Sequence, residues 1–430
     1  MEQFAIEGGH PLTGVVRPSG NKNAALPILA ATLLTDQRVV VRNVPRIWDV
    51  AAMLEILADL GVEIEQLGDH EVALQARNIR KTTPDRRLCE EIRASMLVTG
   101  PLLARCGRVQ MPPPGGCVIG RRRIDTHLLA LQRLGAQVEI DSDYHLQANG
   151  MRGQGIFLDE ASVTATENAL MAAAVAQGQT VIRNAASEPH VQDLARFLVQ
   201  MGARISGIGS NTLTVDGVRS LSGAEHDVVP DHIEVGSLMG LAAATNGRVR
   251  ITDVVHDDLH MIRLVLERIG VLVEMDGSDL IVSRKDPMEI IPDIGMAVPK
   301  IDDGPWPAFP ADLMSIALVV ATQATGTVLF FEKMFESRMF FVDKLVAMGA
   351  QIILCDPHRA VVVGPSRLRG ATLESPDIRA GMALLIAALA AKGRSVIGNI
   401  RQIDRGYERV EERLRPLGAH IERVNSKPGL

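Results

Sequence analysis

The chain has 430 residues, of which 47% are hydrophobic and 3% aromatic, and its formal net charge is −6. So few aromatic rings argue against a stacking platform for single-stranded nucleic acid, and the negative charge argues against a basic surface for a duplex. The length allows more than one domain, each with a large apolar core.

The ends and the apolar runs of the sequence indicate no targeting or membrane segment. The first residues, MEQFAIEGGHPL, have no basic start followed by an apolar stretch, so we expect no secretory signal. The longest apolar runs, such as residues 381–391, reach about 11 residues, whereas a membrane-spanning helix needs about 20. The four cysteines have no metal-ligand spacing, and we expect free thiols in a cytoplasmic protein with no metal: Cys89, Cys106, Cys117 and Cys355.

One structural unit recurs along the whole chain. In each copy a helical segment ends in a large apolar residue followed by glycine, and a short apolar run comes next. These glycines lie about 70 residues apart, which indicates a repeat architecture: Gly61, Gly135, Gly202, Gly270, Gly349 and Gly418.

Each unit is expected to contain the same elements in the same order. It opens with a helix that is apolar nearly all round and should therefore be buried. A β-branched strand follows, then an amphipathic helix, for example around Val50, Met53 and Leu57, and a last strand after the glycine stop. The six buried helices are expected to start near Asn23, Ala94, Glu167, Val235, Asp312 and Ala380.

This pattern predicts an α/β protein with two domains of three units each. A buried helix needs neighbours on all sides, so three such helices should bundle inside an outer layer of sheets and amphipathic helices. A turn-rich stretch before Pro230 marks the break, giving one domain over residues 22–229 and another over residues 1–21 and 230–430. We expect ligands in a cleft between the two domains.

The second unit carries an unusual loop over residues 112–125, PPPGGCVIGRRRID. Its prolines exclude a helix or a central strand. Cys117 lies beside Arg121, Arg122 and Arg123, and cationic neighbours favour the thiolate and attract an anion. The alternative is a small apolar residue in an ordinary loop, but the preceding Gly-Gly lets the backbone approach a ligand and favours the reactive thiol. For the other three cysteines we expect a structural role.

Other polar residues interrupt the repeat near the ends of its elements. Lys22 and Asn23 follow a Ser-Gly-Asn turn at a helix start, a possible anion site. Asp312 stands where a helix N-cap belongs and is interpreted as a cap, a general base, or both. Five cations at equivalent ends suggest a polyanion pocket, although each alone would be read as a surface charge: Lys22, Arg93, Arg122, Arg379 and Arg405.

Several stretches together resemble one family, the UDP-N-acetylglucosamine enolpyruvyl transferases of peptidoglycan synthesis, from Phe4 to Val424. They include SGNKNAALPILAATLL, EEIRASMLVTGPLLAR, PGGCVIGRRRIDTHL, EPHVQDLARFLVQMGA, PDHIEVGSL, PAFPADL, DIRAG and IDRGYERVEERLRPLGA. The related shikimate-phosphate enzymes lack the Gly-Gly-Cys loop and carry a Gly-Asn-Ala-Gly-Thr run that is absent here. The resemblance implies a sixfold inverse α/β barrel fold in two halves, with the cysteine loop as a lid.

The resemblance also implies the reaction and its participants. The enolpyruvyl group of phosphoenolpyruvate would pass to the 3′-hydroxyl of UDP-N-acetylglucosamine with release of phosphate, and no cofactor or metal would be needed. Cys117 would protonate phosphoenolpyruvate, could form a covalent adduct with it, and should react with an electrophilic phosphonate such as fosfomycin. Asp312 would take the proton of the sugar hydroxyl. The phosphate and carboxylate would be held by Lys22, Arg122 and Arg405, with Asp377, Arg379 and Arg338 nearby.

A second set of residues matches family positions that contact the nucleotide sugar: Asn23, Arg93, Arg122, Arg123, Ile124, Asp125, Thr126, Ser162, Val163, Asp312 and Met334. His127, Glu188 and Asp231 match polar positions near the cleft.

Four residues depart from the family pattern at the acceptor or the lid. Glu160 replaces a cation, Thr164 a glycine, Arg123 a proline and Ser337 an asparagine. They leave two alternatives open: a paralogue that uses another nucleotide as acceptor, and a catalytically silent homologue that binds the sugar nucleotide.

Overall fold

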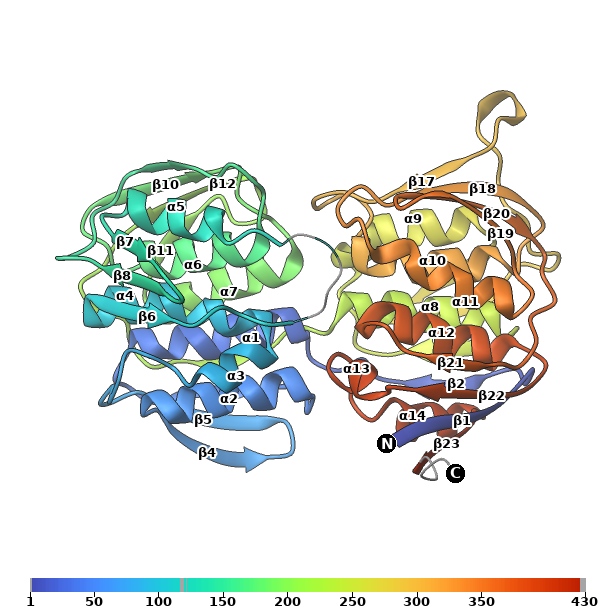
Figure 1. Cartoon of the computed structure of the whole chain (residues 1–430), viewed down its shortest axis with the longest axis horizontal. Coiled ribbons are helices and arrows are strands. Elements are labelled where there is room, and N and C mark those ends of the chain that lie inside the picture. The colour runs from blue at the N-terminus through green and yellow to red at the C-terminus, as the bar shows by residue number, and fades with distance from the viewer. Residues whose placement is uncertain (1, 117–119, 121, 426–430) are drawn as a thin grey trace. The chain divides into compact units, whose positions relative to one another are not determined.

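The computed structural model describes residues 2–116, 120 and 122–425, and these residues divide into two compact units (Figure 1). The N-terminal unit contains residues 20–116 and 122–229. The C-terminal unit contains residues 2–19 and 230–425 together with Gly120. Within the described chain, no helix combines the length and the hydrophobicity needed to cross a bilayer.

Each unit is built around three buried helices. In the N-terminal unit they are α1 (Lys22–Ala31), α4 (Thr99–Cys106) and α6 (Val163–Ala173); in the C-terminal unit they are α8 (His232–Ala244), α10 (Ala311–Ala321) and α12 (Ile378–Ala390). Helices α8, α10 and α12 contact one another. Small residues allow this close packing, because a Cβ atom added to Gly236 would lie 2.5 Å from the side chain of Leu313.

The second buried helix differs from the expected one. Instead of one helix from Ala94, a 3-10 segment η2 (Arg93–Val98) precedes α4. Pro101 lies in the first turn of α4 and has no N–H to donate to the carbonyl of Leu97, so the regular helical hydrogen-bond ladder starts again at Thr99.

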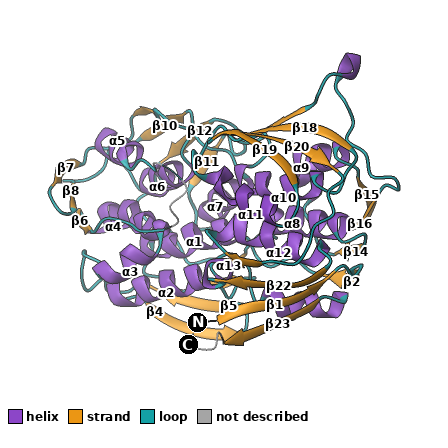
Figure 2. Cartoon of the chain, turned by 45° about the vertical axis from the view of Figure 1, so that its right-hand side comes forward, coloured by secondary structure: helices purple, strands orange, loops and turns teal. Residues whose placement is uncertain are grey.

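Over the described residues, six sheets cover the helices, three in each unit. In the N-terminal unit their strand orders are β13-β3-β5-β4, β6-β8-β7 and β11-β12-β10-β9; in the C-terminal unit they are β21-β22-β1-β23, β15-β16-β14-β2 and β17-β18-β20-β19. Figure 2 shows strands running along the outside of the helices of the C-terminal unit. Each four-stranded sheet joins one parallel pair to antiparallel ladders, whereas the described three-stranded sheet is antiparallel throughout.

The strand bounds in the N-terminal unit are β3 (Val39–Arg42), β4 (Glu63–Gly68), β5 (Glu71–Gln75), β6 (Arg108–Met111), β7 (Gln137–Ile140), β8 (Tyr144–Gln147), β9 (Gly155–Phe157), β10 (Gln179–Arg183), β11 (Arg204–Ser206), β12 (Thr212–Asp216) and β13 (Glu225–Asp227). Those in the C-terminal unit are β1 (Glu2–Gly8), β2 (Thr13–Val16), β14 (Arg248–Ile251), β15 (Val271–Asp276), β16 (Asp279–Arg284), β17 (Lys300–Asp302), β18 (Gly326–Phe331), β19 (Gln351–Asp356), β20 (Arg359–Gly364), β21 (Thr372–Glu374), β22 (Gly393–Gly398) and β23 (His420–Asn425).

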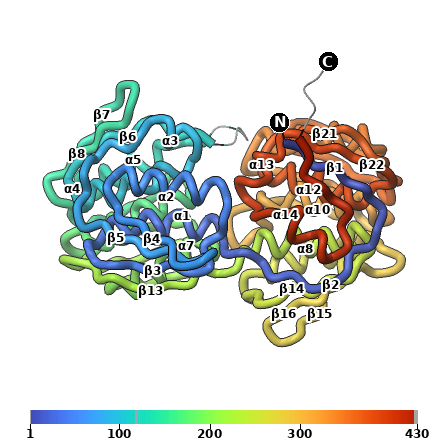
Figure 3. Tube along the Cα trace, turned by 90° about the horizontal axis from the view of Figure 1, so that it is seen from below, coloured from blue at the N-terminus to red at the C-terminus, as the bar shows by residue number. Residues whose placement is uncertain are grey.

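The N-terminal strand completes a sheet made otherwise from the end of the chain. Strand β1 lies between β22 and β23, with Phe4 opposite Ile397 on one side and Arg423 on the other. Figure 3 shows this segment, in blue, beside the red C-terminal segment. The first residues of the chain therefore help to hold the last repeat together.

An amphipathic helix closes each repeat. These helices are α2 (Trp48–Leu60), α5 (Asp125–Arg133), α7 (Pro189–Gln200), α9 (His260–Arg268), α11 (Val342–Ala347) and α14 (Val410–Leu414). The glycine that follows each one has a positive φ, between 92° and 107°. Side chains rarely adopt that conformation, which explains why glycine recurs at all six positions.

Candidate active site

A partly buried carboxylate, Asp312, and two arginines form a charge cluster in the C-terminal unit. Oδ1 of Asp312 accepts a hydrogen bond from Nη2 of Arg338 at 2.6 Å, and Oδ2 accepts one from Nε of Arg379 at 2.9 Å. Burial alone would raise the pKa of Asp312, but the two guanidinium groups hold it well below the usual range. Asp312 is therefore ionised at neutral pH.

The expected N-cap role of Asp312 is wrong. Pro310 occupies the N-cap position of α10, and Asp312 lies in the first helical turn. Its carboxylate oxygens accept hydrogen bonds from the two arginines, and the N-terminus of α10 has no side-chain cap hydrogen bond. A proline-rich approach to the helix sets its start one residue after Pro310, because proline is well suited to the extended cap conformation.

Arg379 is held from three sides. Asp377 caps α12 by accepting hydrogen bonds from the backbone N–H groups of Arg379, at 2.8 Å, and Ala380, at 3.0 Å. The Nη1 atom of Arg379 donates to the hydroxyl of Tyr407 at 3.1 Å, and that hydroxyl also lies 3.0 Å from Oγ of Ser237. The guanidinium position is thus fixed by α8, α10 and the segment after α13 (Arg401–Asp404).

The other predicted residues of the C-terminal unit occupy element ends. Arg405 is mostly buried at the end of α13, with Nη1 3.3 Å from Oε1 of Gln402. Asp231 caps α8, and burial raises its pKa against the opposing effect of Arg379. Met334 is 40% exposed in the turn between β18 and Arg338. The pKa of Asp231 responds to Arg379 and Asp312, so these groups lie within electrostatic reach of one another.

In the N-terminal unit, Lys22 starts α1 and forms a buried ion pair. Its Nζ lies 2.7 Å from Oδ2 of Asp49 on α2. Asn21 caps the helix by accepting hydrogen bonds from the N–H groups of Asn23 and Ala24. Asp49 was not predicted from the sequence, because the pair joins two different helices and leaves no local signal.

Arg93 ties the second repeat to the loop before α5. Its Nη2 donates to the backbone carbonyls of Arg122 and Arg123, each at 2.8 Å. Burial, with a contribution from the charge of Arg122, lowers the pKa of Arg93 to about 10. Arg93 and Arg122 therefore lie close together.

Arg123, Asp125 and Thr126 belong to a network centred on Asp159. Arg123 lies 2.8 Å from Asp159 and 3.3 Å from Asp125, and Oγ1 of Thr126 donates to Asp159 at 2.7 Å. Ile124 precedes α5 at its N-cap. The Arg123 guanidinium thus already has two carboxylate partners, and Asp159 is a residue that sequence reasoning missed.

The first turn of α6, which begins at Val163, brings Thr164 next to His127. Ser162 is the N-cap residue and makes no side-chain cap bond. His127 contacts Thr164 and Asn168, with nitrogen-to-partner distances of 3.0 and 2.9 Å. Asn168 was also missed, because a mid-helix asparagine in an apolar segment has no local sequence signature.

Cys117 and Arg121 lie outside the described residues, so their predicted roles stay predictions. The described cysteines differ among themselves. Cys89 is fully buried and burial raises the pKa of its thiol to about 12. Burial also raises the pKa of Cys106, and Cys355 is exposed.

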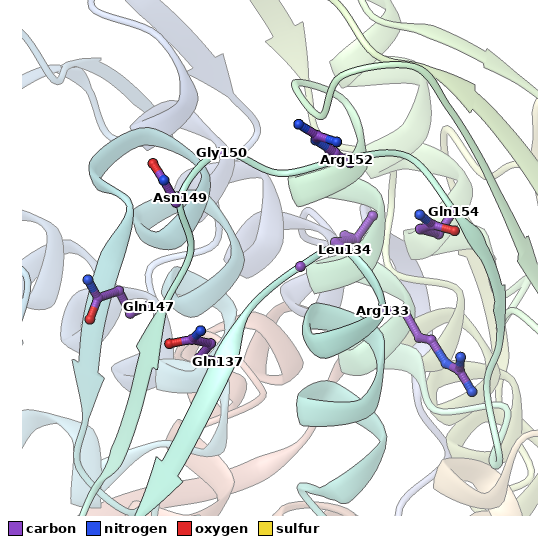
Figure 4. Close-up of a pocket in the computed structure, with 9 residues that line it drawn as sticks. Arg133, Leu134, Gln137, Gln147, Asn149, Gly150, Arg152 and Gln154 are labelled. Atoms are coloured by element: carbon purple, nitrogen blue, oxygen red, sulfur yellow. The ribbon is translucent and has the colours of Figure 1, made fainter.

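Two hollows are found on the N-terminal unit, away from the residues named above. One has a volume of about 360 Å³ and is lined by Arg133, Gln137, Gln147, Asn149 and Arg152, among others (Figure 4). The other, of about 530 Å³, lies beside it around Arg108 and His145. Over the described part of the chain, no cluster of three His, Cys, Asp or Glu residues could hold a metal ion.

Comparison with known proteins identifies the relatives of this chain. Residues 6–414 match the family model described as EPSP synthase (3-phosphoshikimate 1-carboxyvinyltransferase). The UDP-N-acetylglucosamine 1-carboxyvinyltransferase of Bradyrhizobium diazoefficiens is 57% identical over 98% of each chain. The protein of the same name from Treponema denticola is 53% identical over 98% of this chain and 99% of its own.

Solved structures show the same fold. The enolpyruvyl transferase NikO from Streptomyces tendae superimposes with a TM-score of 0.88 at 25% identity, covering 99% of both chains. The EPSP synthase of Acinetobacter baumannii has a TM-score of 0.75 at 18% identity, covering 99% of this chain and 100% of its own. The expected enolpyruvyl transferase fold is confirmed.

Proposed function

This chain belongs to the EPSP synthase family, and we propose that it transfers the enolpyruvyl group of phosphoenolpyruvate to the 3′-hydroxyl of UDP-N-acetylglucosamine, releasing phosphate. The observation that carries the proposal is the 57% identity to a UDP-N-acetylglucosamine 1-carboxyvinyltransferase over 98% of both chains. As such a transferase it would serve peptidoglycan synthesis in the cytoplasm, where both substrates are made, and thereby cell shape and division.

The chemistry requires a proton donor, a proton acceptor and cations for two anionic groups. The sugar oxygen bonds to C2 of phosphoenolpyruvate while C3 gains a proton, and the bond from C2 to the phosphate oxygen then breaks as C3 loses a proton. We assign the proton donor to Cys117, on the resemblance alone. An electrophilic phosphonate of the fosfomycin type should alkylate the same sulfur.

We assign Asp312 to the sugar hydroxyl. Its contacts with Arg338 and Arg379 keep it ionised, as a proton acceptor must be. The same arginines make it a weak base, so proton transfer to it becomes favourable only as the hydroxyl oxygen bonds to carbon and turns acidic. Asp312 therefore orients the hydroxyl first and accepts its proton late.

The cations are assigned to the phosphate and carboxylate of phosphoenolpyruvate. Arg379 and Arg405 are mostly buried, and Lys22 is buried against Asp49. Ion pairs and hydrogen bonds hold these groups in place before substrate arrives, so little reorganisation is needed when negative charge grows on the leaving phosphate. We propose that phosphoenolpyruvate is bound by Lys22, Arg122, Arg379 and Arg405. The acceptor sugar nucleotide would be contacted by Asn23, Arg93 and Met334.

Phosphate release tests the proposal. The protein is incubated with phosphoenolpyruvate and one acceptor at a time. The three acceptors are UDP-N-acetylglucosamine, UDP-glucose and UMP. We expect release with UDP-N-acetylglucosamine and loss of release in Cys117→Ala. Release with another nucleotide only would support the paralogue instead. Nucleotide binding without release by any acceptor would support the silent homologue and refute the proposal.

A further inference from the structure

Two buried carboxyl groups follow the ends of a parallel pair of strands in the C-terminal unit. Strands β17 and β18 pair in parallel, with Asp302 opposite Phe331, so the next residues along the two strands, Asp303 and Glu332, lie side by side. Asp303 is 2% exposed and Glu332 is 0% exposed. The sheet itself therefore brings the two carboxyl groups together in a place that water does not reach.

One oxygen of each carboxyl group holds the turn that follows β18. Oε1 of Glu332 accepts hydrogen bonds from the backbone N–H groups of Met334, at 3.3 Å, and Phe335, at 3.2 Å. Oδ1 of Asp303 accepts a hydrogen bond from the N–H of Lys333 at 2.5 Å. The pair thus supplies acceptors for three successive N–H groups, which would otherwise be costly to bury. The two carboxyl groups therefore fix the backbone of this turn.

The second oxygen of each group needs a proton. Oε2 of Glu332 and Oδ2 of Asp303 are buried and accept no hydrogen bond from the part of the chain that the structure describes. The two side chains are in hydrogen-bonding contact, yet two ionised carboxylates have no donor between them. Burial and the neighbouring carboxyl group raise the pKa of Glu332 to about 9, so Glu332 carries this proton at neutral pH.

Charged and titratable groups face Glu332 from three other segments. Asp303 follows β17, and Nδ1 of His358, in the turn after β19, lies 2.7 Å from the backbone carbonyl oxygen of Glu332. Arg338, further along the chain, is close enough for its charge to affect the pKa of Glu332. The buried Nε of Arg338 has no acceptor among the described residues. An ionised Glu332 would therefore attract this guanidinium group away from Asp312.

The turn leads directly to the arginine that holds Asp312. The ring of Phe335, whose N–H is bound by Glu332, has its centre 5.1 Å from the Arg338 guanidinium carbon, and Arg338 donates to Asp312. We propose that Glu332 and Asp303 share one proton and act together as a positioning pair. The pair fixes the turn so that Arg338 holds the Asp312 carboxylate where the sugar hydroxyl needs it. This inference rests on the proposed function and adds two residues that act through Arg338.

Two variants of Glu332 test the positioning role. Glu332→Gln keeps the acceptor oxygen and carries a permanent N–H donor, whereas Glu332→Ala leaves two N–H groups of the turn without their acceptor. At pH 7.5 we expect kcat for phosphate release to stay within about twofold of the wild type in Glu332→Gln, and to fall at least about tenfold in Glu332→Ala. Glu289→Gln, at an exposed position of the same unit, is the matched control.

The pH profile distinguishes a shared proton from a carboxyl group that only fills space. Loss of the proton near pH 9 should impair the wild type, whereas Glu332→Gln has no proton to lose there. The ratio of kcat in Glu332→Gln to kcat in the wild type should therefore be near one at pH 7.5 and reach about tenfold at pH 10. Taking the ratio removes the titration of groups that both proteins share.

Infrared difference spectroscopy gives a readout that needs no activity. At pH 7.5 the wild type minus Glu332→Gln should show the C=O band of a protonated carboxyl group. The absence of that band, a kcat ratio that stays constant up to pH 10, or an equal loss of kcat in Glu332→Gln and Glu332→Ala would overturn the inference. If Glu332→Ala does not fold, the band and the kcat ratio decide. If the wild type releases no phosphate with UDP-N-acetylglucosamine, the proposed function fails, and the band still decides the shared proton.

Discussion

The Nε atom of Arg379 lies 2.9 Å from Oδ2 of Asp312, and this contact joins the first turns of the buried helices α12 and α10. Arg338, from the turn after β18, holds the other carboxylate oxygen. One carboxylate thus compensates two nearly buried guanidinium groups. Removing it leaves both cations without their partner, which links catalysis and folding at one residue.

Asp312→Asn should therefore lose both activity and stability. We expect the free energy of unfolding to fall by about 3 kcal/mol, because two buried cations lose their charge partner. We expect kcat for phosphate release to fall at least about 100-fold through loss of the proton acceptor. Urea unfolding and steady-state kinetics measure the two effects, and Asp343→Asn, an exposed aspartate on α11, is the control. Unchanged kcat would refute the assigned role.

Tyr407→Phe tests the support behind Arg379. The hydroxyl of Tyr407 contacts Arg379 and Ser237 in a buried position, and its loss leaves both groups short of a partner. We expect a decrease of about 1–2 kcal/mol in unfolding free energy and a lower kcat/KM for phosphoenolpyruvate. Tyr144→Phe, for which no hydroxyl contact is found in the described structure, should leave the unfolding free energy nearly unchanged.

Glu332 makes stability depend on pH. It is fully buried, and burial, with the adjacent carboxyl of Asp303, raises its pKa to about 9. Oε2 of Glu332 and Oδ2 of Asp303 have no hydrogen-bond donor, so a proton on Glu332 supplies one. The folded state then binds a proton that the unfolded chain releases above its pKa of about 4.3, and stability falls as pH rises between these values.

Glu332→Gln should remove this dependence. Relative to the variant, the wild type should lose up to about 1.4 kcal/mol of unfolding free energy per pH unit between pH 6 and 8. Urea unfolding across that range measures the difference, with the exposed Glu289→Gln as control. Parallel pH profiles for the wild type and Glu332→Gln would show that Glu332 is ionised in the folded protein.

Alkylation of the cysteines should follow exposure and thiol pKa. A fosfomycin-type reagent at pH 7.5 should label Cys117 first. Cys355 is exposed and should react next with a general thiol reagent, while Cys89, buried with a raised pKa, should react only after unfolding. Peptide mass mapping gives the order. Labelling of Cys89 or Cys355 ahead of Cys117 would contradict the proposed reactive thiol.

The glycine stops differ in how much they tolerate a side chain. At Gly202 a Cβ atom meets nothing within 4 Å. The variant Gly202→Ala should therefore lose only about 1–2 kcal/mol of unfolding free energy, from the backbone strain of a positive φ. At Gly61 the same atom would also lie 2.9 Å from the carbonyl oxygen of Asn78. Gly61→Ala should therefore lower the thermal midpoint more than Gly202→Ala; equal shifts would mean that the loop around Asn78 moves freely.

Local patterns predicted the repeated elements well, because helix periodicity and glycine stops are short-range signals. Apolar periodicity predicted the buried and the amphipathic helices. The recurring glycines, such as Gly61 and Gly202, predicted where the amphipathic helices end, and all six have a positive φ. The break at Pro101 and the true N-cap at Pro310 were missed, since helix ends depend on which backbone groups find partners.

Side-chain contacts between residues far apart in the sequence could not be predicted from it. Asp49 beside Lys22, Tyr407 beside Arg379 and Asn168 beside His127 come from different elements of the chain. Only the fold brings these pairs together. Arg123 was expected to bind substrate, and in the fold its guanidinium contacts Asp159, 36 residues further along the chain.

Product analysis tests the central claim most directly. The wild-type protein is incubated with phosphoenolpyruvate and UDP-N-acetylglucosamine, and phosphate and nucleotide products are quantified together by colorimetry and mass spectrometry. We predict one phosphate released for each sugar nucleotide that gains a carboxyvinyl ether at its 3′-oxygen. Phosphate release without that ether, or an unmodified sugar nucleotide after complete consumption of phosphoenolpyruvate, would contradict the account.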